Sequence, residues 1–345
     1  VKIYNQAQEI VMKERKKPDI AMNWNSSLHF LRTRDLKRGW EYWELGFDKA
    51  VGTMGRNLIP QVKVLPRADH LDKFDPEKWT LICVEQGIGD QILFLSAMED
   101  AIEEWKNLFF VCEARLKPII KRSFPKLQVG LPGLLESWTQ NSLEKNGFMP
   151  LGSLPGRYRP SVESFTNYKK AFLQVNGDLY VQYQKQLRDL AKGRPIVGIS
   201  WKGGYWESQK KAKALGIENW LPIFERGALC VNLQYGDTAA DENLIKEKGY
   251  ELVSFPKVDF KSKLDDWLAI SAACDGIISV STALVHFAGA CGQKVGIVMP
   301  EPQGPWILGI DDEWSIAYPN VAIFRRNRDE SVTELVDRVA KVIVA

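Results

Sequence analysis

An α/β fold with two parallel sheets is the architecture that this sequence predicts, and three observations support it. Short β-rich apolar runs alternate with segments of helical spacing, their connections are short, and the alternation starts twice, near residues 79 and 195. Strand, helix, strand with short connections is the βαβ unit, which builds parallel sheets. At 345 residues the chain is too long for one ordinary α/β domain and suits two. We therefore expect two successive Rossmann-like halves joined near Lys192, preceded by a helical hairpin.

Residues 1–50 are expected to hold the hairpin. The stretch from about Ile20 to Ala50 has helical spacing and is rich in Trp, Leu and Phe. It divides around Asp35, a residue type that caps helix N-termini well. The apolar face must be buried, either in an isolated hairpin or in the last unit of a helical repeat, and the chain contains no second copy.

Residues 51–192 are expected to form the first Rossmann-like half. The run WTLICV predicts a strand, QILFLSAMEDAIEEW a helix, NLFFVC a second strand and EARLKPIIKRSF a second helix. Two further helical stretches are predicted between about Ser161 and Lys192.

Residues 193–345 repeat the alternation and are expected to form the second half. Strands are predicted at RPIVGIS, ALCVNLQ, YELVSF, DGIISVS, KVGIVMP and VAIFRR, and helices at ENWLPIFERG, 242–248, KLDDWLAISAAC, TALVHFAGACG and SVTELVDRVAKVI. Folds built from two such halves bind ligands where the carboxyl ends of their strands face each other.

Composition excludes several classes of function. A net charge of +3 is too small to predict nucleic-acid binding. No stretch of the sequence approaches the roughly 18 consecutive apolar residues of a membrane span. The N-terminal stretch is polar and has no signal-peptide pattern. Five scattered cysteines without a CxxC pair, and three histidines without metal-ligand spacing, predict a cytoplasmic protein without disulfides or bound metal.

The turn between the first predicted strand and its helix is the first candidate site. It contains Gln86, Gly87, Gly89 and Asp90. Paired glycines let the backbone approach a ligand, but the dinucleotide fingerprint G-x-G-x-x-G is incomplete because Ile92 stands at its last position. The carboxylate of Asp90 could accept a proton from a substrate hydroxyl, or it could simply cap the helix, and the local sequence favours neither.

Three strand ends of the second half supply further candidates, each with a structural alternative. Ser281 and Thr282 offer hydroxyls and amides to a phosphate, and His286 falls on the same helical face unless it is an ordinary core histidine. Lys202, after Ser200, could give a point charge to a leaving phosphate or be only a solvated lysine. Gln234 and Tyr235 could hold a base or ribose, or form a plain strand-to-turn exit.

Together these runs resemble the heptosyltransferase-like glycosyltransferases of the family 9 type. The resemblance lies in EQGIGDQILFLSAMEDA, GISWKGG, VNLQYGD, DDWLAISAACDGIISVSTALVHFAGACG and EWSIAYPNVAIFRR, and it covers about residues 20–340 in order. RDLKRGWEYWELGF resembles the end of a tetratricopeptide repeat region, as in the subgroup whose transferase domain follows such repeats.

The resemblance implies a glycosyltransferase B fold, with the acceptor bound by the first half and the nucleotide sugar by the second. It implies Asp90 as the catalytic base, Lys202 near the phosphate-binding lysine, and Ser281, Thr282 and His286 as the donor-binding turn. We expect Lys202 to take part in catalysis beside Asp90, and the remaining donor-binding residues to be Gln86, Gly87, Gly89, Ser200, Gln234 and Tyr235. The expected reaction is an inverting transfer to a hydroxyl of a protein or glycan, without metal or other cofactor, and the N-terminal helices are a candidate surface for a protein partner. A non-catalytic nucleotide-sugar-binding scaffold and a sugar-nucleotide epimerase of the same fold are the alternatives.

Overall fold

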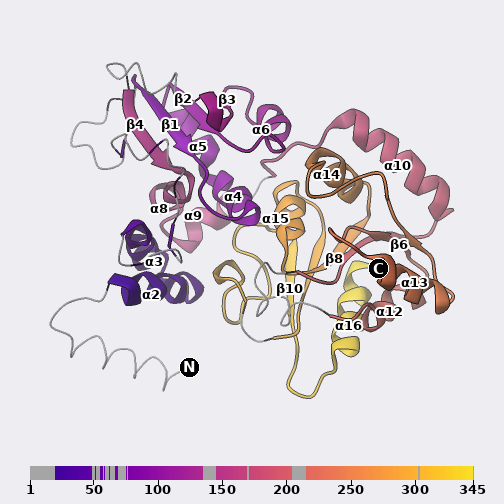
Figure 1. Ribbon diagram of the computed structural model, residues 1–345. Coiled ribbons are helices and arrows are strands. Elements are labelled where there is room, and N and C mark those ends of the chain that lie inside the picture. The colour runs from indigo at the N-terminus through magenta and orange to yellow at the C-terminus, as the bar shows by residue number, and fades with distance from the viewer. Residues whose placement is uncertain are drawn as a thin grey trace.

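The computed structural model describes residues 20–48, 51, 55–56, 58, 62, 67–68, 75, 77–134, 145–168, 171–203, 215–301 and 304–344. Within them the chain forms two sheets, each built of parallel strands, and a pair of helices precedes both (Figure 1). Residues 1–19 and 49–50 of the expected hairpin region, and most of residues 51–76 of the expected first domain, lie outside this set. The α/β class and the paired parallel sheets are confirmed.

The N-terminal helices divide where the sequence predicts. Helix α2 (Ile20–Arg32) and helix α3 (Leu36–Trp43) are followed by the 3₁₀ turn η1 (Glu44–Phe47). Asp35 is the N-cap of α3, and its side chain accepts a hydrogen bond from the backbone N–H of Arg38. The two helices approach so closely that a Cβ at Gly39 would lie 2.5 Å from Leu31 Cδ2.

The first lobe contains a four-stranded sheet in the order β3-β2-β1-β4. Its strands are β1 (Trp79–Cys83), β2 (Leu108–Val111), β3 (Gln128–Gly130) and β4 (Lys145–Pro150). The surrounding helices and turns are α4 (Ile88–Phe94), η5 (Leu95–Ala97), α5 (Met98–Glu104), α6 (Lys117–Ser123), η6 (Pro132–Leu134), η7 (Leu151–Ser153), α8 (Leu154–Tyr158) and α9 (Val162–Thr166).

One helix expected in this lobe is interrupted. The sequence predicts a single helix over 91–105, whereas the structure has α4 and α5 separated by the tighter turn η5. At that break the carbonyl of Ser96 accepts a hydrogen bond from the buried guanidinium of Arg159, which also pairs with Asp100. This long-range hydrogen bond provides a donor for the carbonyl of Ser96 at the break, where the α-helical hydrogen-bond pattern is interrupted.

The second lobe contains a six-stranded sheet in the order β10-β9-β8-β5-β6-β7. Its strands are β5 (Ile196–Ser200), β6 (Leu229–Asn232), β7 (Leu252–Val253), β8 (Gly276–Val280), β9 (Val295–Met299) and β10 (Val321–Arg325). Its helices and turns are η8 (Ile217–Trp220), α12 (Leu221–Glu225), α13 (Ala239–Glu247), α14 (Leu264–Ala272), α15 (Ala283–Ala290), η9 (Trp306–Leu308) and α16 (Val332–Ile343).

Helix α10 (Gly177–Ala191) packs on the second lobe, although it precedes the expected boundary at residue 192. Tyr183 donates a hydrogen bond to Asp266 of α14 at 2.6 Å, and Arg188 pairs with Asp275. Earlier in the chain, the backbone N–H groups of Phe172 and Leu173 both donate to the carbonyl of Ala290 at the end of α15.

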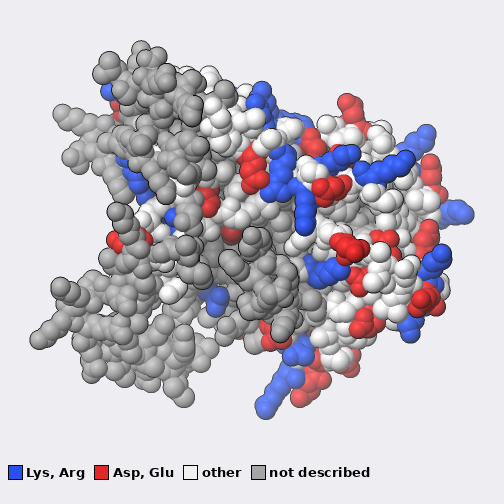
Figure 2. Space-filling model, viewed as in Figure 1, with Lys and Arg blue, Asp and Glu red and all other residues white. Residues whose placement is uncertain are grey.

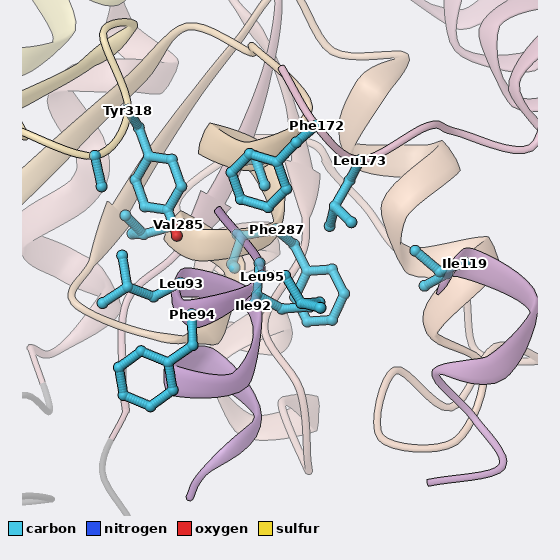
Figure 3. Close-up of a cluster of buried hydrophobic side chains, with 14 of the residues drawn as sticks. Ile92, Leu93, Phe94, Leu95, Ile119, Phe172, Leu173, Val285, Phe287 and Tyr318 are labelled. Atoms are coloured by element: carbon cyan, nitrogen blue, oxygen red, sulfur yellow. The ribbon is translucent and has the colours of Figure 1, made fainter. Parts of the chain in front are cut away.

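The two lobes touch where α4 meets α15, and these helices lie side by side between the sheets (Figure 1). Side chains of Ile92, Leu93 and Phe94 from α4 lie with Val285 and Phe287 from α15 in one buried cluster (Figure 3). At another contact, Arg122 of α6 forms an ion pair with Asp265 of α14. The strand ends that carry the candidate residues of each half therefore approach one another.

The helical pair contacts both lobes. Trp40 Nε1 donates to the carbonyl of Arg159 at 2.9 Å in the first lobe, and its ring meets Trp306 of the second edge-on, with centroids 5.3 Å apart. Arg34 pairs with Asp312 and donates to the carbonyls of Trp306 and Ile307.

Charges of both signs are interspersed over the described part of the face shown in Figure 2. In the part of the chain that the structure describes, every helix is too short or too polar to cross a membrane.

Candidate active site

The conformation of the turn after β1 depends on a glycine and on one buried glutamine. Gly87 is the N-cap of α4 and contributes no side-chain cap, and Asp90 is the third residue of the helix. Gln91 donates from its backbone to the carbonyl of Gly87 at 3.0 Å and from Nε2 to the carbonyl of Gln86 at 2.7 Å. Asp90 thus stands in the first helical turn, partly buried, rather than in the capping position itself.

Gly89 permits the closest approach between the lobes at this turn. A Cβ placed there would lie 2.9 Å from His286 Cδ2, 3.5 Å from His286 Nε2 and 3.6 Å from the Cα of Ala283. The first distance is shorter than real Cβ contacts allow. A residue other than glycine would therefore displace either the imidazole of His286 or the turn that carries Asp90.

His286 is fixed on its other side by Tyr318. The Tyr318 hydroxyl lies 3.1 Å from His286 Nδ1, and the two rings meet edge-on with centroids 5.8 Å apart. Tyr318 reaches from the loop before β10 to the α4–α15 contact (Figure 3). Burial, and secondarily the nearby carboxylate of Asp90, raise the pKa of Tyr318 well above its usual value, which keeps its hydroxyl protonated. Asp90, His286 and Tyr318 consequently form one cluster contributed by both lobes.

The carboxyl ends of β8, β5 and β6 lie next to each other because these strands are neighbours in the sheet. The loop after β5 abuts the turn after β8 so tightly that a Cβ on Gly203 would lie 2.7 Å from Thr282 Cγ2. Thr282 is the buried N-cap of α15, its hydroxyl lies 3.3 Å from that of Ser279, and Ser281 beside it is partly exposed. The amides that begin α15 therefore lie beside the loop that carries Lys202.

Gln234 ties the ends of β5 and β6 together. Its Oε1 accepts hydrogen bonds from Ser200 Oγ at 3.1 Å and from the backbone N–H of Lys202 at 2.9 Å, while Nε2 donates to the carbonyl of Tyr235. Ser200 and Gln234 are both buried. Their observed contacts shape the loop, whereas the ring of Tyr235 is partly exposed and its pKa is raised by burial.

The ammonium of Lys202 is engaged by an acid that the sequence reading did not single out. Lys202 Nζ lies 2.8 Å from Asp241 Oδ2 and donates to the carbonyl of Asp237 at 3.1 Å. The same carboxylate oxygen accepts from Trp201 Nε1 at 3.0 Å. A donor phosphate would have to compete with Asp241 for this charge.

A buried ionic network lies behind the Asp90 turn. The side chains of Arg56 and Glu85 are fully buried and paired, and Arg56 also binds Glu44 of η1 and Ser153 of η7, each through Nη atoms at 2.8 and 2.9 Å. Burial raises the pKa of Glu85; it also opposes ionisation of Glu44, but Arg56 and Arg67 outweigh that effect and hold the Glu44 pKa below its usual value. The residue that begins the Asp90 turn is thereby anchored to the N-terminal helices.

The structure thus brings most of the sequence candidates into two connected groups. Asp90, Gly89 and His286 meet at the contact between the lobes, and Thr282, Gly203, Ser200, Lys202 and Gln234 surround the strand ends of the second lobe. Sequence reasoning missed Tyr318, Gln91 and Asp241. Only Gln91 had a local signal, since it directly follows the turn that it closes.

Two solved structures share this architecture. A glycosyl transferase of family 9 from Veillonella parvula is 10% identical with a TM-score of 0.57, covering 77% of this chain and 97% of that one. The ADP-heptose lipopolysaccharide heptosyltransferase II of E. coli is 12% identical with a TM-score of 0.53, covering 77% and 98%. At these identities the likeness establishes the fold, and the expected glycosyltransferase B architecture is confirmed.

Among curated proteins, Protein FlbA of Caulobacter vibrioides is 29% identical over 300 residues, or 83% of this chain. That alignment covers 48% of FlbA, so this chain spans about half the length of its curated relative. No protein-family model matches the chain.

Proposed function

We propose that this protein is a glycosyltransferase that moves a sugar from a nucleotide-sugar donor to a hydroxyl of a protein or glycan acceptor. The fold that it shares with a family 9 glycosyl transferase and with an ADP-heptose heptosyltransferase supports this class of reaction. The motifs of the sequence resemblance lie at the strand ends that meet between the lobes, where such folds bind their ligands.

The observation that carries the proposal is the position of Asp90. Its carboxylate stands in the first turn of α4, where that helix contacts α15, and it acts electrostatically on Tyr318 of the other lobe. In the proposed step Asp90 accepts the acceptor's hydroxyl proton while the acceptor oxygen bonds to the anomeric carbon. The bond from that carbon to the phosphate oxygen breaks on the opposite face, so the configuration inverts and the nucleotide leaves with the bonding electrons.

The donor is proposed to bind mainly to the second lobe, beside the glycine turn of the first lobe that contains Gln86, Gly87 and Gly89. The amides and hydroxyls at Ser281 and Thr282 and the imidazole of His286 would take its phosphates, since helix N-termini favour anions. Tyr235, and Gln234 through the loop it shapes, would hold the base or ribose. Lys202 would reach the leaving phosphate after exchanging its partner Asp241.

The remaining assignments belong to the same proposal. Residues 51–192 would carry the acceptor side and residues 193–345 the donor side, with the helical pair as the contact surface for a protein partner. The reaction as proposed needs no metal or other cofactor, and a reduced cytoplasmic location suits the buried, unpaired Cys83, Cys112 and Cys230.

The test combines turnover with nucleotide binding in Asp90→Asn. A positioned general base contributes about 10²–10⁴ in rate, so turnover should fall by that factor. The thermal shift produced by nucleoside diphosphates should persist, because the proposed donor contacts lie mainly on the other lobe. The matched control is Asp178→Asn, which changes an exposed acid in the first turn of α10 and should leave both readouts unchanged.

Three results would contradict the proposal. Full turnover in Asp90→Asn would remove Asp90 as the base. Nucleotide binding by the wild type without sugar release or transfer, across a panel of donors and acceptors, would favour a scaffold. Conversion of one nucleotide sugar to another without an acceptor would favour an epimerase.

A further inference from the structure

The contact between Tyr318 and His286 has a directionality that the distances alone leave open. His286 Nδ1 and the Tyr318 hydroxyl are 3.1 Å apart, and either group can in principle be the donor. A phenol is the more acidic of the two and gives the stronger donor, whereas the lone pair of a neutral imidazole is the stronger acceptor. Because burial and Asp90 keep the phenol protonated, its proton is available for this bond.

The surroundings of Tyr318 hold the phenol in one place. Tyr318 is 2% exposed, and its ring lies so close to Gly289 of α15 that a Cβ there would be 2.6 Å from Tyr318 Cγ. Phe172 stacks against the Tyr318 ring with centroids 6.4 Å apart (Figure 3). Phe172 is itself tied to α15 through its N–H bond to Ala290.

The opposite edge of the imidazole faces the first lobe. The atoms of His286 nearest to the Cβ position of Gly89 are Cδ2 and Nε2, so this edge borders the turn that carries Asp90. In the tautomer that carries its proton on Nε2, that N–H therefore lies at the contact between the lobes, beside the proposed base.

We infer that Tyr318 is a positioning residue whose hydroxyl donates a hydrogen bond to Nδ1 of His286 and so fixes the neutral tautomer with the proton on Nε2. In this tautomer Nε2–H is a donor on the side of the ring that faces the Asp90 turn. This inference rests on the proposed function, in which Nε2–H would donate a hydrogen bond to a phosphate oxygen of the bound nucleoside diphosphate. Tyr318 itself touches neither substrate nor base in the reaction; it acts through His286.

The chain is well suited to a direct test, because it contains only three histidines. In the ¹⁵N-histidine-labelled full chain at pH 8, long-range ¹H–¹⁵N spectra report which ring nitrogen carries the proton. His286→Gln identifies the His286 signals by their loss. We expect the wild type to show Nε2–H with an accepting Nδ1, and Tyr318→Phe to replace this by a mixture of tautomers.

Nucleotide binding supplies the second readout. Tyr318→Phe removes the hydrogen bond that fixes the tautomer of His286, and with it the ordered Nε2–H group. The Kd for a nucleoside diphosphate should therefore rise about 5-fold in this variant. The matched control is Tyr183→Phe, which removes the hydroxyl of another buried tyrosine, 5% exposed, that bonds Asp266 at 2.6 Å on the α10–α14 contact. It should change neither the His286 spectrum nor the Kd.

The outcomes separate this inference from the proposed function. A wild-type His286 with its proton on Nδ1, or an unchanged His286 spectrum in Tyr318→Phe, overturns the role of Tyr318 whatever the activity. The same spectral change in Tyr183→Phe overturns it as well, since the effect would then be general. An Nε2–H tautomer lost in Tyr318→Phe, in a protein that binds no nucleotide, would uphold the positioning contact while refuting the proposed function.

Discussion

Replacing Gly89 by alanine should impair turnover much more than it impairs folding. The new methyl group would lie 2.9 Å from His286 Cδ2, whereas ordinary contact begins at 3.4 Å, so the imidazole or the Asp90 turn must move by about half an ångström. The imidazole cannot turn freely, because Tyr318 holds Nδ1. A displacement of 1 Å at reacting groups can cost about 10²-fold in rate, so we expect a fall of about 10-fold in kcat.

The free energy of unfolding should change little in the same variant. Alanine in a helix gains about 0.5–1 kcal/mol over glycine through the unfolded chain, which offsets part of the strain at the lobe contact. Urea unfolding and steady-state transfer rates measure the two effects separately. The control is Gly177→Ala at the start of α10, where a Cβ meets no atom within 4 Å and turnover should not change.

Unchanged turnover in Gly89→Ala would refute the reasoning, because the close approach of the two lobes would then have no bearing on the chemistry. A large loss of stability with equal loss of activity would also count against it, since the effect would be on folding.

Two further predictions concern charges. Arg34→Met removes the pairing with Asp312 and the bonds to two carbonyls of η9, and should lower the free energy of unfolding by about 1.5–3 kcal/mol in urea titration. Arg38→Met, which removes an exposed pairing with Asp35 in the same helical pair, should cost only about 0.2–1 kcal/mol, and equal losses would mean that Arg34 does not anchor the helices. If Lys202 contacts the donor phosphate, calorimetry should show a Kd for nucleoside diphosphate about 10-fold higher in Lys202→Met than in the wild type. In Asp241→Asn the ammonium of Lys202 is released from its ion pair, so the Kd should be about 2- to 5-fold lower. Two unchanged affinities would leave Lys202 as a surface ion pair only.

Most of the fold could be predicted because its signals are local. The apolar runs predicted β1, β2 and the six strands of the second sheet, and Asp35 marked the start of α3 through a bond to a residue three positions away. Strands β3 and β4 of the first sheet were missed. The break at η5 could not be foreseen, because the carbonyl of Ser96 is bound by Arg159, 63 residues further along the chain.

The candidate site was predictable to the extent that it lies at strand ends. Parallel topology places the residues after β5, β6 and β8 on one edge, which is why Ser200, Gln234 and Thr282 lie together. Tyr318 falls within the run EWSIAYPNVAIFRR without being singled out there, and Asp241 stands in no motif. They reach His286 and Lys202 across 32 and 39 residues, through the packing of a loop and of a neighbouring helix.

The attachment of the helical pair to both lobes has a mechanical consequence. If the two lobes rotate apart around Asp90 and the helical pair stays with the first lobe, the contact of Trp40 with Trp306 must shift or the pairing of Arg34 with Asp312 must break. If the pair stays with the second lobe, the hydrogen bond from Trp40 to the carbonyl of Arg159 must break. The helical pair therefore restrains rotation of one lobe relative to the other. A protein partner that binds these helices, as proposed above, would thereby act on the angle between the lobes.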